Sequence, residues 1–256
     1  MRALPLVSVA TAIGTLLVTG NVLAQQATAT ATVGAPAAPA GAVAGNSDHD
    51  AMVGRLGIGY LGRRSVSVGA AGAVDAMAPE RTVDAPVVGV RVWLNPMLGI
   101  DAGLGFVTTS GSSEIEAPGA APASVDNPST LGFVLHGGVP LSLAADSHFS
   151  FQIIPELNLG YASRSRELTT GDSIDQSGLH FDIGGRAGAE IHFGFMGIPQ
   201  LSLQGSVGLR IDYDSSSTDD GSTNQTFTYS QFGISTTTYD NPWNIFVSNV
   251  AAIYYF

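Results

Sequence analysis

The stretch that decides the fold is GLHFDIGGRAGAEIHFGF, residues 178–195, in which apolar and polar side chains alternate without interruption. The odd-numbered positions from Leu179 to Phe195 are apolar or glycine, and the even-numbered positions carry glycine or ionisable groups: His180, Asp182, Arg186, Glu190 and His192. Successive side chains of a strand point to opposite faces, so this pattern predicts a strand with one apolar and one charged face. Globular strands usually run for about 3–10 residues, and this one is longer.

The same alternation recurs along the chain and predicts eight strands, over 55–61, 87–94, 98–108, 130–143, 149–161, 178–195, 200–213 and 243–256. Three of their connections are short: Asn95-Pro96, 144–147 and 196–199. The other four, 62–86, 109–129, 162–177 and 214–242, are long and rich in Ser, Thr, Gly, Asp and Pro. An even number of strands, with short turns at one rim and long loops at the other, is typical of bacterial outer-membrane barrels.

Strand length agrees with a membrane setting. Twelve steps of about 3.3 Å from Phe149 to Tyr161, tilted by about 40°, give a height of roughly 30 Å, which is about the thickness of a bilayer's hydrocarbon core. Aromatic residues stand at both ends of the predicted strands. We therefore predict an all-β, eight-stranded antiparallel up-and-down transmembrane β-barrel, with the charged faces inside and the apolar faces towards lipid.

The N-terminal region has the composition of an export segment. Arg2 precedes an apolar stretch from Leu4 to Val18, and Val22-Leu23-Ala24 ends in a small residue, so residues 1–24 are predicted to be a cleaved signal peptide. An uncleaved anchor is the alternative, but the apolar stretch is short for a bilayer span of about 20 residues. Residues 25–52, rich in Ala, Thr, Pro and Gly, are predicted to be a flexible leader, and 53–256 the barrel.

At this point the chain resembles the small eight-stranded outer-membrane proteins, the OmpA/OmpX-like barrels, over about residues 53–256. The signal peptide, the alternating strands and the ending AAIYYF carry the resemblance. It implies that Tyr254 and Phe256 are recognised by the barrel-assembly machinery, and that both termini are periplasmic. The last strand departs from the family pattern at Ser248, and its opposite face is too apolar for a regular lumen.

Charged side chains are expected to line the interior, and their near balance of Arg and carboxylate favours a self-satisfied network that plugs the lumen. The alternative is a narrow gated pore for ions or small apolar solutes. Arg186 should find its partner on a neighbouring strand, either Glu156 or Asp212 or a polar group. The expected lumen residues are Arg55, Arg91, Asp101, His136, Glu156, Asp182, Arg186, Glu190, Arg210 and Asp212, with His180 and His192 on the same faces.

Signs of catalysis are weak. His148-Phe149-Ser150 has the His-x-Ser spacing of outer-membrane lipid A deacylases, but the pair lies at a short, periplasmic turn. His180 and His192 are on one strand and about 40 Å apart, so they cannot share a metal ion. We expect neither an enzyme nor a bound cofactor or metal, and keep a lipid-modifying hydrolase as a remote alternative.

Composition limits the partners. The net charge is −11, with no lysine and no cysteine, which argues against nucleic acid and against disulfides. We expect a monomer in outer-membrane lipid and lipopolysaccharide, whose long loops meet an unidentified partner. A secreted lipocalin-like barrel, with its apolar side chains inside, is the alternative fold. The long strands, aromatic rims and terminal Phe argue against it.

Overall fold

The computed structural model describes residues 47–69, 81–115, 123–168, 171–221, 225–239 and 241–256. The predicted signal peptide, 1–24, and the predicted leader as far as residue 46 lie outside these residues. Among the described residues, none of the helices has the length and apolar character needed to cross a membrane.

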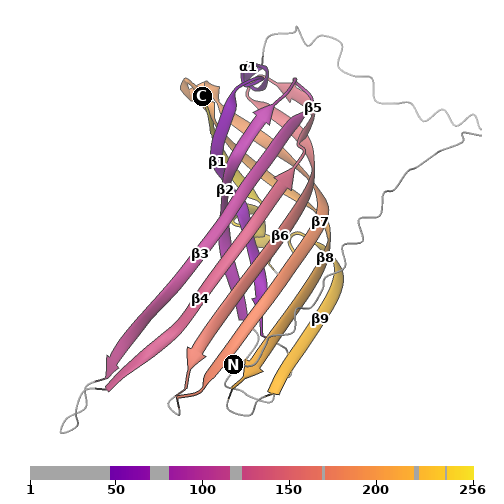
Figure 1. Cartoon of the computed structure of the whole chain (residues 1–256). Coiled ribbons are helices and arrows are strands. Elements are labelled where there is room, and N and C mark those ends of the chain that lie inside the picture. Colours follow the sequence, from indigo (N-terminus) through magenta and orange to yellow (C-terminus); the bar gives the residue numbers. More distant parts are fainter. Residues whose placement is uncertain (1–46, 70–80, 116–122, 169–170, 222–224, 240) are drawn as a thin grey trace, which may run out of the picture. The chain divides into compact units, whose positions relative to one another are not determined.

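The described chain is almost entirely antiparallel strand (Figure 1). In chain order its elements are α1 (Asp48–Ala51), β1 (Leu56–Val68), β2 (Arg81–Trp93), β3 (Gly99–Ile115), β4 (Ala123–Gly138), β5 (Leu141–Asp146), β6 (Phe149–Glu167), β7 (Ser173–Phe193), η1 (Gly194–Met196), β8 (Ile198–Asp220), β9 (Gln225–Thr236), η2 (Pro242–Phe246) and β10 (Val250–Tyr255).

Eight of these strands close into a ring. They neighbour one another in the order β10-β1-β2-β3-β4-β6-β7-β8, and β10 also pairs with β8, which completes the circuit. The all-β, antiparallel prediction is confirmed. Ten strands are described rather than the eight predicted, because one predicted strand is divided in two and one further strand, β9, forms within a predicted loop.

The first interruption divides 130–143. Pro140, which has no N–H to donate, falls between β4 and β5, and both strands pair with β6. The second changes 243–256. Here η2 replaces the first residues of the predicted strand, and only β10 is a strand. β9, which was predicted to be loop, pairs with the half of β8 that is far from α1. The ring is therefore uneven at this position.

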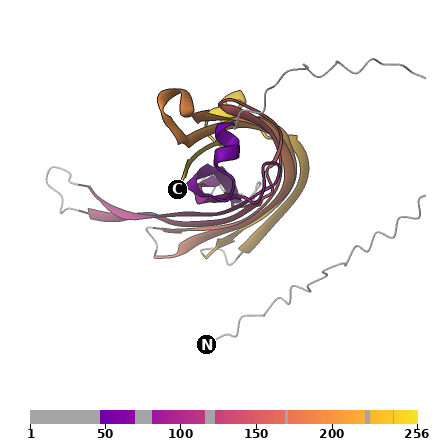
Figure 2. The same cartoon turned by 90° about the horizontal axis from the view of Figure 1, so that it is seen from above.

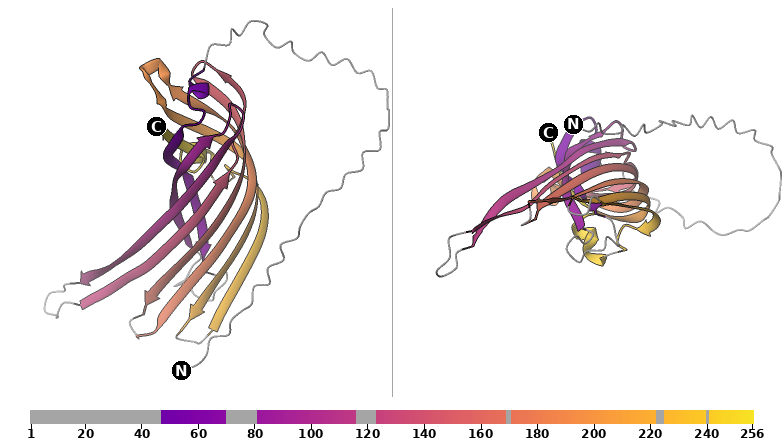
Figure 3. Two further views of the ribbon diagram at one scale, coloured as in Figure 1. Left: turned by 45° about the horizontal axis from the view of Figure 1, so that its top comes forward. Right: turned by 60° about the horizontal axis from the view of Figure 1, so that its bottom comes forward.

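The predicted long loops are in large part strand. β6 and β7 stay paired as far as Glu167 and Ser173, and β8 and β9 as far as Asp220 and Gln225. These hairpin ends lie opposite to α1 and the short turns (Figures 1 and 3). At the ends of β6 and β8 polar side chains occupy both faces, so apolar–polar alternation is missing there although the backbone ladder continues.

The alternation of the opening stretch is confirmed in β7. Its even-numbered positions face the interior, where the ionisable side chains are buried, and its odd-numbered positions face outwards. The buried set is His180, Asp182, Arg186, Glu190 and His192, and the exposed set includes Leu179, Phe181, Ile183 and Ile191.

β1 leaves the wall of the ring half-way along its length. Its pairing with β2 shifts between Tyr60 and Arg63, and Gly62 takes a φ of 106°, which suits glycine. Beyond this bulge β1 stays paired with β2 as far as Val68 and Arg81, whereas the pairing of β2 with β3 begins only at Val87. The end of β1 reaches β8, where Ser216 Oγ donates to the carbonyl oxygen of Gly69 at 2.9 Å. Seen from above, the sheet curves around β1 (Figure 2).

This inward course creates an apolar core inside the ring. Val66 and Val68 are buried against side chains of β2, β4 and β6, and the cluster continues towards α1. Its members are Met52, Leu61, Val66, Val68, Val83, Ala85, Val87, Trp93, Val134, Ala162, Ala251, Ile253 and Tyr255.

The end of the predicted leader differs from expectation. Ser47 and Asp50 form a capping box that starts the single turn of α1. His49 and Met52 are each 1% exposed, so this segment packs onto the end of the ring rather than remaining a free linker.

Candidate functional site

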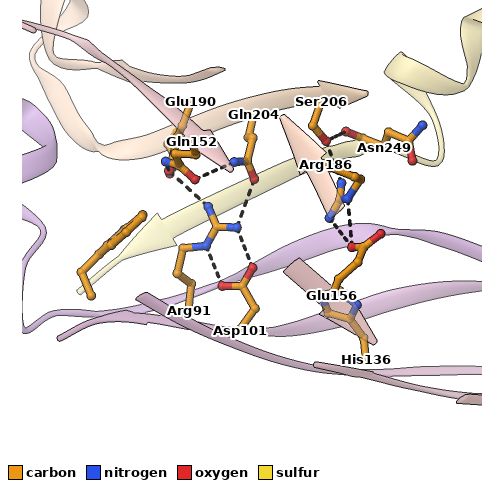
Figure 4. A network of polar contacts seen from close by, with 12 residues as sticks. Arg91, Asp101, His136, Gln152, Glu156, Arg186, Glu190, Gln204, Ser206 and Asn249 are labelled. Atoms are coloured by element: carbon orange, nitrogen blue, oxygen red, sulfur yellow. Dashed lines mark hydrogen bonds and ion pairs between the residues drawn. The ribbon is translucent and has the colours of Figure 1, made fainter. Parts of the chain in front are cut away.

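A set of buried charges lies across the interior, and its first group surrounds Arg91. Its guanidinium donates to both carboxylate oxygens of Asp101, at 2.7 and 2.6 Å, and to Glu190 at 3.1 Å. Gln204 accepts a fourth bond at 3.0 Å. All four side chains are buried, and together they join β2, β3, β7 and β8 across the ring (Figure 4).

A second group surrounds Glu156. Its Oε2 accepts from Arg186 Nε at 2.9 Å and from Arg64 Nη2 at 3.0 Å. Arg186 also donates to Ser206 Oγ at 2.7 Å. The predicted partnership of Arg186 and Glu156 is confirmed (Figure 4).

A third group continues towards the hairpin ends. His136 contacts Asn158 at 2.7 Å, and Asn158 donates to Asp182 at 2.8 Å. His180 lies between two carboxylates, with Nε2 2.9 Å from Asp182 and Nδ1 2.7 Å from Asp214. Carboxylates only accept, so the imidazolium form of His180, a donor at both nitrogens, satisfies both contacts.

Apart from His136 Nε2, which has no partner among the described residues, the members of each group hydrogen-bond to one another or to neighbouring residues. A guanidinium that bridges two carboxylates is among the strongest hydrogen-bonded arrangements in proteins. Removing a charged member would take an opposite charge away from a buried group, so each group holds several strands in one arrangement.

Three predicted lumen residues lie at the margin or outside. Arg55 is exposed and its Nε donates to Ala51 O at 2.9 Å, away from the buried groups. Arg210 and Asp212 are partly exposed and 3.7 Å apart, where β8 meets β9. Arg55 fails to point inwards because it precedes β1 and belongs to the turn after α1.

The residues expected to act as an assembly signal are on the outside of the ring. Tyr254 and Phe256 are 42% and 67% exposed, and their rings make an edge-to-face contact at 5.1 Å.

A small polar cavity of about 210 Å³ lies where β1 has left the wall. Its lining includes Arg63, Arg64, His180, Asp214, Asn244 and Asn249, from β1, β7, β8 and the η2 region. Charged and amide side chains of this kind are unsuited to an apolar solute.

The sequence raised two candidate chemistries, a His148–Ser150 hydrolase pair and a metal site at His180 and His192, and the structure treats them differently. His148 pairs with Asp48 at 2.7 Å, whereas Ser150 is buried and accepts from Gln152 at 2.8 Å, so each is bound to another residue. His192 does not approach His180, but it lies near Glu190 and His49, and the ligand atoms of these three residues are all within 4.8 Å of one another.

The sequence pattern did not identify two residues of these buried clusters. Arg64 falls in a predicted loop, and the bulge at Gly62 turns it inwards. His49 falls in the predicted leader, where the local indication of structure is the Ser47–Asp50 capping box. The buried Gln152, Asn158 and Gln204 were on the correct faces but carry no charge to mark them.

Comparisons with protein-family models, with curated proteins and with solved structures give no match for this chain.

Proposed function

We propose that this chain is a closed β-barrel of the bacterial outer membrane with a structural or surface-interaction role. One observation carries the proposal: the polarity of the ring is the reverse of that of a water-soluble barrel. Phe106, Ile183 and Leu209 on the outer face are 57%, 50% and 61% exposed, while Arg91, Asp182 and Glu190 are buried inside.

The outer face supports a lipid environment. Large apolar side chains are exposed on every strand of the ring, and an apolar surface of this extent is unfavourable in water. A closed ring also pairs its backbone groups within the sheet, as a hydrocarbon surrounding requires. A lipocalin-like protein would instead keep its apolar side chains inside.

The interior supports closure rather than conduction. Buried ion pairs join strands across the ring, and the inward part of β1 places Val66 and Val68 in the interior as well. An eight-stranded barrel has an interior just wide enough for side chains to fill. A role that needs no aqueous passage follows from this arrangement.

The hairpin ends support contact with the outside medium. Beyond the aromatic positions Tyr161 and Tyr213, the outward residues of β6 and β8 include Ser163, Ser165 and Ser217. We propose that this hydroxyl-rich sheet surface meets lipopolysaccharide headgroups or a surface partner. Assembly through Tyr254 and Phe256 by the barrel-assembly machinery, and a monomeric state, belong to the same proposal.

Cysteine labelling in intact Gram-negative cells tests this proposal, because the chain has no cysteine of its own. Thr226→Cys places one thiol at the β8–β9 hairpin, and Ala145→Cys places one at the β5–β6 turn; both positions are exposed. A membrane-impermeant maleimide should label Thr226→Cys in intact cells and Ala145→Cys only after lysis. Labelling of both variants in intact cells, or of neither, would overturn the proposed placement.

A further inference from the structure

Three buried side chains meet where α1 packs onto the end of the ring. His49 comes from α1, and Glu190 and His192 come from β7. They are 1%, 0% and 0% exposed, and each offers a ligand atom within 4.8 Å of the other two.

The hydrogen bonds of the His49 and His192 imidazoles show which ring nitrogens carry a proton and which have a lone pair. His49 Nε2 is 2.8 Å from the carbonyl oxygen of Pro96, and His192 Nδ1 is 3.2 Å from that of Pro199. A carbonyl oxygen only accepts, so those nitrogens carry the protons. The lone pairs of neutral rings are then on His49 Nδ1 and His192 Nε2, and these two buried atoms have no hydrogen-bond partner among the described residues.

Glu190 lies with one oxygen towards the same place. Its Oε2 accepts from Arg91 and Gln152, while Oε1 accepts from Ser202 at 2.6 Å and from Tyr255 at 3.0 Å. An ion bound at Oε1 would take the place of one of these two hydroxyl donors. Oε1 is also 3.9 Å from His192 Nε2, too far for a hydrogen bond. Two imidazole lone pairs and a carboxylate oxygen therefore converge on one place.

We propose that His49, Glu190 and His192 bind a divalent transition-metal ion of the Zn²⁺ type. Two imidazoles and one carboxylate are a ligand set that zinc accepts, with solvent in the fourth position of the tetrahedron. Metal-bound histidines almost always donate their other ring N–H to a carbonyl or carboxylate, as Pro96 and Pro199 allow here. The ion would fasten the segment before β1 to the end of the ring.

His136 provides a matched control inside the same protein. It is a buried histidine whose Nε2 also lacks a partner in the described part of the chain, but it does not belong to a group of ligand atoms there. Replacing it removes one buried imidazole and leaves the proposed site intact.

Zinc content of the purified chain, prepared without a histidine tag, tests the proposal. After EDTA treatment, equilibration with Zn²⁺ and removal of loosely bound ion, we expect one zinc per chain for the wild type and for His136→Gln. Loss of a partner of a metal ligand typically costs about 10–100-fold in affinity, so loss of a ligand in His49→Gln or His192→Gln should cost at least about 100-fold. His49 belongs to α1 and not to a strand of the ring, so we expect this variant to keep the strand pairing.

Electron paramagnetic resonance with Cu²⁺ in place of Zn²⁺ gives a second readout. The wild type should show coupling to two imidazole nitrogens, and His49→Gln to one. A wild type that retains no zinc, or a His49→Gln variant that retains as much as His136→Gln, would overturn the proposal. Neither result bears on the outer-membrane proposal, which the labelling experiment tests separately.

Discussion

At the scale of single residues, the buried arginines decide whether the interior holds together. Arg186→Ala leaves the carboxylate of Glu156 with Arg64 as its remaining cationic partner, and leaves Ser206 without its donor. Breaking a buried ion pair by removing one partner costs about 3–5 kcal/mol. Because Arg64 still faces Glu156, we expect a loss at the lower end of this range, about 3 kcal/mol, in the free energy of unfolding, measured by urea titration in detergent micelles.

The matched control is Arg55→Ala, which removes an exposed arginine with one backbone contact. A surface substitution of this kind usually changes stability by less than about 0.5 kcal/mol. Equal losses for the two variants would show that Arg186 contributes no more than a surface residue.

At the scale of elements, the inward course of β1 depends on glycine in the strand opposite. A Cβ at Gly178 of β7 would collide with the carbonyl oxygen of Ser67, a backbone atom that can move only if β1 moves. Gly178→Ala should therefore destabilise the protein by about 1–3 kcal/mol, as overpacking does. Unfolding in urea measures this difference.

Gly185→Ala is the control in the same strand, because a Cβ there meets nothing within 4 Å. Replacing a glycine where space and backbone permit stabilises by about 0.4–1 kcal/mol through the unfolded chain. If Gly178→Ala is as well tolerated as Gly185→Ala, β1 does not cross the interior at Ser67.

The same strands show how far the sequence could predict this structure. Alternation predicted the faces of β7 correctly, and with them the meeting of Arg186 and Glu156. In β1, Ile58, Tyr60, Val66 and Val68 share one parity and would all face outwards in a regular strand. The bulge at Gly62 adds one residue and reverses the parity, so Val66 and Val68 face inwards.

Long-range packing accounts for the rest of what the sequence pattern missed. The ends of β6 and β8 have polar side chains on both faces, so these parts of the ladder left no periodic signature. The approach of His49 to Glu190 and His192 joins segments far apart in the sequence, and no local pattern encodes that contact.

At the scale of the whole molecule, ring closure by β10 should make the protein resistant to detergent. A ring without an open edge keeps its backbone pairs until heated. We expect the unboiled chain to migrate faster than the boiled chain on a dodecyl sulfate gel. A chain ending at residue 249, which lacks β10, should lose that difference, and identical mobilities for the full chain before and after boiling would contradict closure.

The central claim is that buried charges and the inward half of β1 close the interior, and single-molecule conductance tests it most directly. The purified chain is added to a planar lipid bilayer in concentrated KCl, with a known porin in a parallel experiment to show that insertion is detected. We predict insertion, verified by protease protection in vesicles of the same lipid, without discrete conductance steps. Reproducible steps from the inserted wild-type chain would contradict the closed interior and favour a narrow channel.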